Sequence, residues 1–217
     1  QWLPKSFIRK SVVVMGTGPA GIAMSHHLLM EGCAVVAMDG LKIEPVISFD
    51  INQPIKDYST IQQELSKRTI YGFGGVSEYG ITARWDKNFL LLIYISLLRR
   101  TYFRIIGQVR FGGNFTIPDV RQLGFQHLCI AVGAGLPREL VIKDSLAPGM
   151  RQANDFLMYL QLTGSYRDSA LLHMEVQLPA VVIGGGLTAI DTATEVQAYY
   201  IKQVEHMLLR FEKLVDF

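Results

Sequence analysis

A glycine-rich turn between two apolar runs constrains the fold of this chain more than any other feature. The run Ser11–Met15 predicts a strand buried on both faces of a parallel sheet. The turn Gly16–Gly21 (GTGPAG) follows at once, and a helix is expected over Ile22–Glu31. A second buried strand is expected over Ala34–Met38, closed by Asp39. Together these segments predict a strand-turn-helix-strand unit of an α/β fold that binds a dinucleotide.

Each small residue of the turn has a separate physical task. Gly16 allows the sharp turn from strand to helix, Gly18 lets the backbone approach a pyrophosphate, and Gly21 lets helix and strand pack closely. The phosphate would lie on the free N–H groups of the helix that begins near Pro19. Asp39 ends the second strand and is placed to accept hydrogen bonds from a ribose hydroxyl. The alternative is a glycine turn of an α/β protein that binds nothing.

A second copy of the pattern lies near the end of the sequence. A strand is expected over residues 179–183, followed by Gly184-x-Gly186-x-x-Ala189, in which alanine replaces the third glycine. From Leu187 a helical pattern runs to the end of the chain, about 42 Å at 1.5 Å per residue. Its apolar stripe has no local partner, so we expect it to pack on a second copy or on another domain.

The middle of the chain gives weaker signals. A helix is expected over Ser59–Tyr71, with Thr60 and Gln63 spaced as a capping box. The other expected elements are helices and short strands over Phe89–Phe103, Val109–Phe111, His127–Val132 and Asn154–Leu162. These elements complete a Rossmann-like, three-layer α/β domain followed by the start of a second Rossmann unit and a long terminal helix.

Composition excludes several classes of function. With 21 basic and 19 acidic residues the net charge is +2, which gives no reason to expect a nucleic-acid or membrane partner. The longest apolar run, Phe89–Leu98, is about half of what a bilayer-spanning helix needs. We expect no metal site at His26 and His27, and no disulfide mechanism from the isolated Cys33 and Cys129. A cytoplasmic location is the expectation.

Four further motifs follow one another along the chain: Gly74-Gly75-x-x-x-Tyr79-Gly80-Ile81-x-x-Arg84-x-x-Lys87, residues 131–140 (AVGAGLPREL), Asp155-Phe156-Leu157, and residues 182–191 (VIGGGLTAID). In this order they resemble the glutamate synthase small (β) subunit and its relatives among the two-dinucleotide-binding flavoproteins. The resemblance implies FAD on the first fingerprint and NAD(P)H on the second. The residues it implies are Gly16, Gly18, Pro19, Ala20 and Asp39 for the pyrophosphate and ribose of FAD, Gly74 and Gly75 for the flavin end, Val109 for adenine, Ala131–Gly133 beside the pyrophosphate, and Gly184, Gly186, Leu187 and Thr188 for NAD(P)H.

The resemblance also implies an activity, in which hydride passes from NAD(P)H to FAD and electrons pass onward to other domains or to a partner. Residues 1–178 would form the first part of an FAD-binding domain, and residues 179–217 the start of an NAD(P)-binding domain. The absence of an initiator Met and the unfinished second unit lead us to expect a piece of a longer protein. The alternatives are a nucleotide-binding or interaction module without catalysis of its own, and an adrenodoxin-reductase-like electron donor to a ferredoxin.

Overall fold

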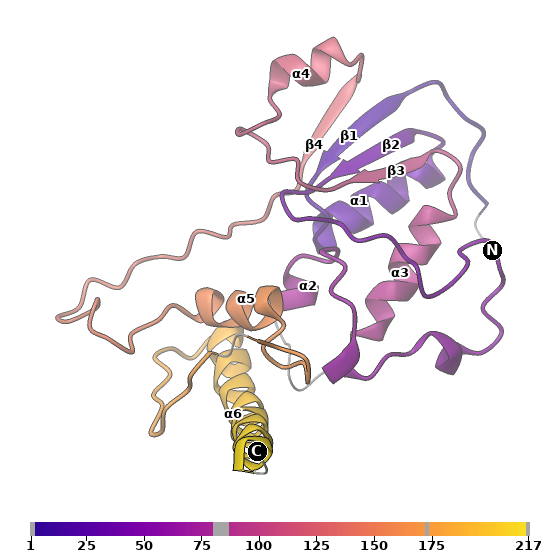
Figure 1. Cartoon of the computed structure of the whole chain (residues 1–217). Coiled ribbons are helices and arrows are strands. Elements are labelled where there is room, and N and C mark those ends of the chain that lie inside the picture. Colours follow the sequence, from indigo (N-terminus) through magenta and orange to yellow (C-terminus); the bar gives the residue numbers. More distant parts are fainter. Residues whose placement is uncertain (1–2, 80–86, 172–173, 216–217) are drawn as a thin grey trace. The chain divides into compact units, whose positions relative to one another are not determined.

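The computed structural model describes residues 3–79, 87–171 and 174–215 (Figure 1). The chain forms two compact units. Unit 1 consists of Gln1–Gln62, Tyr71–Glu78 and Lys87–Gly133, and unit 2 consists of Gln63–Ile70, Tyr79–Asp86 and Ala134–Phe217. The predicted boundary between residues 178 and 179 stays a prediction.

Unit 1 is built on a four-stranded parallel sheet. Its strands are β1 (Ser11–Met15), β2 (Ala34–Met38), β3 (Phe103–Ile106) and β4 (His127–Ile130), in the spatial order β3-β2-β1-β4. The predicted strands over residues 11–15 and 34–38 are confirmed. The connection from β1 leads to β2 on one side, and the connection from β3 leads to β4 on the other side of β1. The strand order therefore reverses between β1 and β4, and ligands of open α/β sheets bind beyond the carboxyl ends of the strands at such a position.

Alternate residues of β1 supply the cores on the two faces of the sheet. Val12 and Val14 are buried against helices α1 (Pro19–Met30) and α3 (Asn88–Leu98), which cover one face (Figure 1). Val13 and Met15 are buried on the other face, in a cluster with Phe115 and with Val120 of the short helix α4 (Ile117–Gln122). Burial on both faces explains why β1 is apolar throughout, as a parallel central strand requires. The expected α/β architecture is confirmed.

Unit 2 is organised around the helices α5 (Ala153–Thr163) and α6 (Leu187–Val215). The buried ring of Tyr199 on α6 packs with Leu160 of α5, and its hydroxyl donates to the carbonyl of Met174 at 2.9 Å. Gln203 closes the same core by bonding both backbone groups of Val176, at 2.7 and 3.0 Å. The predicted helix from Leu187 is confirmed as far as Val215, and the last two residues of the prediction lie outside the described residues.

The side of α6 that is buried in unit 2 carries polar residues. It is not the apolar stripe that the sequence predicts to be covered. The buried residues at the centre of the helix include Glu195, Tyr199 and Gln203. Apolar residues of the final turns stay exposed, namely Ile201, Val204, Met207, Leu208, Phe211 and Leu214. The expected contact of this stripe with a second copy or another domain stays a prediction.

The helix expected over Ser59–Tyr71 is wrong. The structure has two short 3₁₀ turns there, Tyr58–Ile61 and Leu65–Lys67. The carboxylate of Asp57 accepts the N–H of Ser59 at 2.9 Å, and the Thr60 hydroxyl bonds the Asp57 carbonyl at 2.7 Å. Short polar side chains that bond the nearby backbone give the chain an alternative to a helix, and here that alternative prevails over the expected capping box.

Three strand and helix boundaries also need correction. The helix expected over Phe89–Phe103 ends at Leu98, so that its last predicted residue begins β3. The strand expected over Val109–Phe111 is reduced to a single bridge between Phe111 and Phe115. Residues 179–183 lie outside any strand, and Val181 is 84% exposed. A strand needs a neighbouring strand, and the described residues of unit 2 include none.

None of the helices within the described ranges is both long enough and apolar enough to cross a bilayer.

The start of α4 gives a pH-dependent prediction. The Asp119 carboxylate accepts the backbone N–H of Thr116 at 2.7 Å and its hydroxyl at 2.6 Å. These two bonds hold the pKa of Asp119 below its usual range. The stability that they contribute is therefore present above the unfolded pKa and is lost as the pH falls through the lower folded pKa.

We expect Asp119→Asn to lower the Tm at pH 7, and the difference from wild type to shrink as the pH falls below the usual pKa of a carboxyl group and through the lower folded pKa of Asp119. Calorimetry at several pH values measures this difference, with Glu139→Gln as a control that removes an exposed carboxylate. A difference that persists unchanged at low pH would show that the capping bonds do not depend on the charge of Asp119.

Candidate functional site

The first glycine of the fingerprint lies where β1 meets the end of β4. Gly16 has a φ of +102°, and its N–H donates to the carbonyl of Met38 at 2.6 Å. A Cβ at Gly16 would lie 2.2 Å from the carbonyl oxygen of Ala131. The ladder between these strands continues through the N–H of Ala131, which donates to Met15 at 2.7 Å. Only glycine fits this turn, which brings Gly16 and Ala131 together at the carboxyl edge of the sheet.

Helix α1 begins at this edge with an open amino terminus. Its N-cap residue is Gly18, which provides no side-chain cap, and its first turn contains no acidic residue. Pro19 and Ala20 are exposed, whereas Gly21 is buried against the turn. The first N–H groups of a helix have no partner within the helix, and its dipole favours an anion at that end. This terminus can therefore bind a phosphate group.

A second pair of glycines, distant in the sequence, lies against the turn of the first fingerprint. Gly74 donates its N–H to the carbonyl of Thr17 at 3.0 Å, and the short helix α2 (Val76–Tyr79) begins just beyond. Gly75 has a φ of +53°, and a Cβ there would lie 2.7 Å from the Cα of Gly18. The structure thus brings Gly74 and Gly75 against the turn. Gly80, Ile81 and Arg84 of the same motif lie outside the described residues.

The carboxylate of Asp39 is hydrogen-bonded to the glycine turn. Oδ2 accepts both the N–H and the hydroxyl of Thr17, each at 2.8 Å, and Oδ1 accepts the N–H of Leu41 at 2.9 Å. The sequence predicts Asp39 but not Thr17. A hydroxyl residue between the first two glycines, with an acid at the end of the next strand, was the signal that could have identified Thr17.

The remaining residues expected around FAD lie at the ends of the neighbouring strands. Val109 donates its N–H to the carbonyl of Asp39 at 2.8 Å, which places its backbone beside the end of β2. Gly133 follows β4 with a φ of +73°, and a Cβ there would meet no atom within 4 Å. Unit 1 therefore contains the FAD candidates of the first fingerprint, the second glycine pair, Val109 and the end of β4 along one edge of its sheet.

The second fingerprint belongs to unit 2 and lies on an exposed loop that leads into α6. Gly184 has a φ of +138°, and a Cβ there would lie 3.3 Å from the side chain of Ala189. A Cβ at Gly186 would meet nothing within 4 Å, and its carbonyl accepts the N–H groups of Ala189 and Ile190. Leu187 is the first residue of α6 and is 81% exposed, and Thr188 follows it in the helix. The turn is formed, although the strand expected before it is absent.

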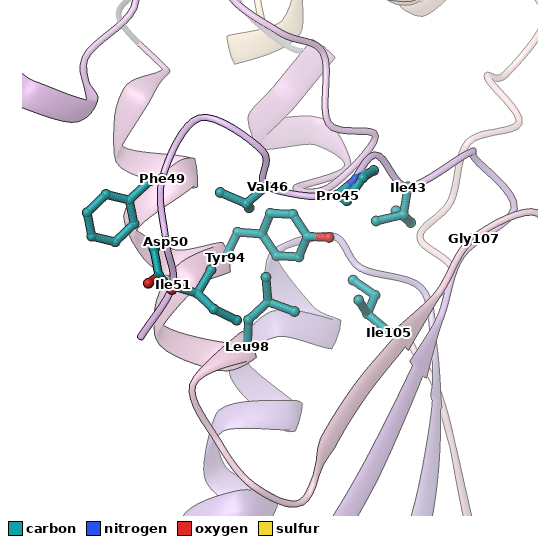
Figure 2. A pocket seen from close by; sticks show the side chains of 10 residues that line it. All are labelled: Ile43, Pro45, Val46, Phe49, Asp50, Ile51, Tyr94, Leu98, Ile105 and Gly107. Atoms are coloured by element: carbon teal, nitrogen blue, oxygen red, sulfur yellow. The ribbon is translucent and has the colours of Figure 1, made fainter. Parts of the chain in front are cut away.

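A cavity of about 490 Å³ lies elsewhere in unit 1, between the connection after β2 and helix α3 (Figure 2). Tyr94 lies across it, with a hydroxyl that donates to the Glu44 carbonyl at 3.1 Å. Burial raises the pKa of Tyr94 to about 12, so the phenol stays protonated. None of the predicted cofactor residues is among those that line it, which are Ile43, Pro45, Val46, Phe49, Asp50, Ile51, Tyr94, Leu98, Ile105 and Gly107.

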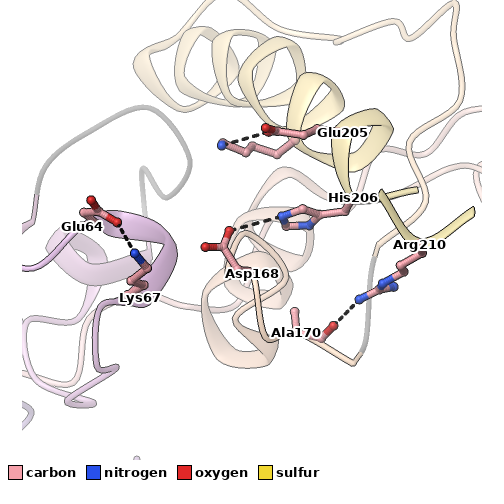
Figure 3. Close-up of polar contacts among 8 residues, drawn as sticks. Glu64, Lys67, Asp168, Ala170, Glu205, His206 and Arg210 are labelled. Carbon is pink, nitrogen blue, oxygen red and sulfur yellow. Dashed lines mark hydrogen bonds and ion pairs between the residues drawn. The ribbon is translucent and has the colours of Figure 1, made fainter. Parts of the chain in front are cut away.

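Polar contacts in unit 2 connect the loop after α5 to α6 (Figure 3). His206 Nε2 lies 3.6 Å from Asp168 Oδ1, and Arg210 donates to the carbonyl of Ala170 at 2.5 Å. Exposed pairs lie nearby, such as Lys67 with Glu64 at 2.8 Å, which raises the pKa of Lys67. Exposed pairs of this kind contribute little to stability. We assign this group to the packing of the loop rather than to chemistry.

The two cysteines are free thiols. Cys33 is buried, and Cys129 on β4 is half-buried, with a pKa that burial raises. A raised pKa lowers the thiolate fraction and therefore the reactivity of a thiol. These properties fit two packing residues.

The parallel order β3-β2-β1-β4, with a glycine turn leading into an open helix terminus, defines an α/β protein of the dinucleotide-binding class. The family model of the pyridine nucleotide-disulphide oxidoreductases matches residues 10–214. The chain therefore belongs to this oxidoreductase family. Membership of this family confirms the expected flavoprotein type of domain.

Two curated proteins are similar to the chain. It is 45% identical over 203 residues to an uncharacterized protein of Rickettsia prowazekii (strain Madrid E), covering 94% of this chain and 29% of that protein. It is 23% identical over 192 residues to the glutamate synthase [NADPH] small chain of Bacillus subtilis (strain 168), covering 87% of this chain and 33% of that protein. The chain thus spans about a third of the length of these relatives.

Among solved structures, 6-hydroxypseudooxynicotine amine oxidase of Pseudomonas geniculata N1 matches with a TM-score of 0.44 and 17% identity. The match covers 73% of this chain and 20% of that one.

Proposed function

We propose that this chain is the FAD-binding portion of an NAD(P)H-dependent flavin oxidoreductase of the glutamate synthase-like kind. Membership of the oxidoreductase family supports the redox class, and the weak similarity to a glutamate synthase small chain supports the finer assignment. The electrons would pass onward to other domains of a longer protein or to a separate partner. Residues 1–178 would form the FAD-binding part, and residues 179–217 the start of the NAD(P)-binding part.

The observation that carries the proposal is the crossing of two glycine segments at the carboxyl edge of the sheet. A Cβ at Gly18 would meet only the Cα of Gly75, at 3.7 Å, so the rest of its surroundings is open. The exposed start of α1 lies directly beside it, without an acidic side chain in its first turn. A concave backbone surface with free N–H groups is what a pyrophosphate requires. The residues present therefore fit the proposed cofactor.

In this arrangement the residues of the chain bind and orient the cofactor. The N–H groups at the start of α1, at Ala20 and Gly21, would bind the pyrophosphate, while Asp39 would accept a ribose hydroxyl. Gly74 and Gly75 would let the chain pass close to the flavin end. FAD, when bound, supplies the acceptor for the hydride of NAD(P)H, which is the usual division of work between a cofactor and its protein.

The second fingerprint would bind the pyrophosphate of NAD(P)H through Gly184, Gly186, Leu187 and Thr188. Its exposed turn and the open space around Gly186 support this role. No acid, base or nucleophile of the chain is assigned a part in the transfer.

Titration of the purified chain with FAD tests the proposal. We expect saturable quenching of flavin fluorescence with one site per chain, and binding of FMN at least about tenfold weaker, because FMN lacks the adenosine monophosphate half of FAD. Equal affinity for FMN and FAD would place the contacts on the flavin rather than on the fingerprint. Absence of FAD binding would contradict the proposed function. Oxidation of NADPH by the FAD-loaded chain with an artificial acceptor then separates an enzyme from a binding module.

A further inference from the structure

We propose that Thr17 is a positioning residue that leaves Asp39 a single acceptor position for a ribose, so that the site recognises an adenosine diphosphate group through one ribose hydroxyl. This inference rests on the proposed function, because it concerns the same nucleotide site. Thr17 is 2% exposed and occupies the position between the first two glycines of the fingerprint.

The count of acceptor positions carries the inference. An ionised carboxylate offers about four lone-pair positions, two on each oxygen. Both positions of Oδ2 are used by Thr17, through its N–H and its hydroxyl at 2.8 Å each. One position of Oδ1 is used by the N–H of Leu41 at 2.9 Å. One acceptor position on Oδ1 therefore remains for a ligand.

Hydrogen bonds of its backbone also fix the main chain of Asp39, so that its carboxylate starts from a fixed position. Its N–H donates to the carbonyl of Ile106 at 3.0 Å, and its own carbonyl accepts the N–H of Val109 at 2.8 Å. These bonds hold the residue on the side of β3, while Thr17 holds its side chain on the side of β1. The orientation of the carboxylate is fixed before any nucleotide arrives.

Thr17 further connects the acid to the second glycine segment. Its carbonyl accepts the N–H of Gly74 at 3.0 Å, while its N–H and hydroxyl bond Asp39. All three polar groups of the residue are thus engaged within the nucleotide site. Such an arrangement is typical of a residue that positions its neighbours.

The consequence is a specific pattern of nucleotide discrimination. A carboxylate with two free positions could accept both ribose hydroxyls, whereas one free position accepts only one. Removing the hydroxyl that bonds a charged acceptor weakens binding by about tenfold or more, whereas removing the other has little effect. A phosphate on the ribose would meet the negative charge of Asp39 and be disfavoured.

Isothermal titration of the whole chain with ADP, 2′-deoxy-ADP and 3′-deoxy-ADP tests this pattern. For wild type we expect one deoxy analogue to bind about tenfold more weakly than ADP, and the other within about twofold. In Thr17→Val the hydroxyl bond is lost and the carboxylate is less fixed, so the tenfold ratio should shrink to about threefold. Thr17→Ser keeps the hydroxyl and should retain the wild-type ratio.

A merely structural role of Thr17 would weaken the three nucleotides equally and leave their ratios unchanged, which would overturn the inference. Equal losses for both deoxy analogues in wild type would overturn it as well, since they would indicate two free acceptor positions. Thermal melts of the variants report separately on folding. If wild type binds neither ADP nor FAD, the proposed function itself fails, whereas ADP binding with the wrong ratios removes only this inference.

Discussion

Replacing Gly21 with alanine is expected to destabilise unit 1 severely, although alanine is the better helix former. A Cβ at this position would lie 1.8 Å from the carbonyl oxygen of Gly16 and 2.9 Å from its carbonyl carbon. Gly16 has little room to shift, because it lies so close to the backbone of Ala131 that a Cβ at Gly16 would be 2.2 Å from the Ala131 carbonyl oxygen. We expect a loss of at least about 4 kcal/mol, which is a large part of the typical stability of a domain.

Whether Gly21→Ala lowers or raises the free energy of unfolding shows whether α1 packs closely on the turn. In an exposed helix the same change would stabilise by about 1 kcal/mol, because alanine has the higher helix propensity. Urea unfolding followed by circular dichroism measures the difference. Gly40→Ala is the matched control, because a Cβ at Gly40 would meet no atom within 4 Å. A Gly21→Ala variant as stable as the Gly40→Ala control would show that α1 does not pack closely on the turn.

Replacing Gly18 with alanine should leave the chain folded but weaken its binding of FAD. This is the opposite of Gly21→Ala, which is expected to lower stability. The new Cβ would meet only the Cα of Gly75 at 3.7 Å, an ordinary contact, so the Tm should stay close to wild type. The same methyl group would occupy the open space where the proposed pyrophosphate approaches the backbone. We expect FAD affinity to fall at least about tenfold, or about 1.4 kcal/mol.

Fluorescence titration with FAD, beside a thermal melt of each variant, separates these two effects. Gly135→Ala is the matched control, because a Cβ there would meet nothing within 4 Å and Gly135 lies outside the fingerprint. Wild-type affinity in Gly18→Ala would mean that the pyrophosphate does not approach this residue.

The first strand-turn-helix-strand unit could be predicted from the sequence because its signals are local. The apolar runs of β1 and β2, and the small residues between them, specify the strands and the turn without reference to the rest of the chain. The long helix α6 was predictable for the same reason, since its periodicity extends over many turns.

Contacts between distant segments were not predictable in this way. Strand β3 begins at Phe103, with only four residues between it and the end of α3 at Leu98, and only pairing with β2 defines it as a strand. The approach of Gly75 to Gly18 joins segments more than fifty residues apart. The hydrogen bonds of Thr17 depend on where the carboxyl end of β2 lies beside the turn. Side-chain partners of this kind follow from the assembled sheet rather than from spacing.

We propose above that the turn between β1 and α1 binds the diphosphate of a nucleotide cofactor. Backbone amide resonances of the ¹⁵N-labelled chain, recorded by NMR during a titration with ADP, test it most directly. We expect the amides of Gly18, Ala20 and Gly21 to show the largest saturable shifts, because their N–H groups surround the proposed diphosphate position. Amides that stay unchanged at saturating ADP would contradict the account.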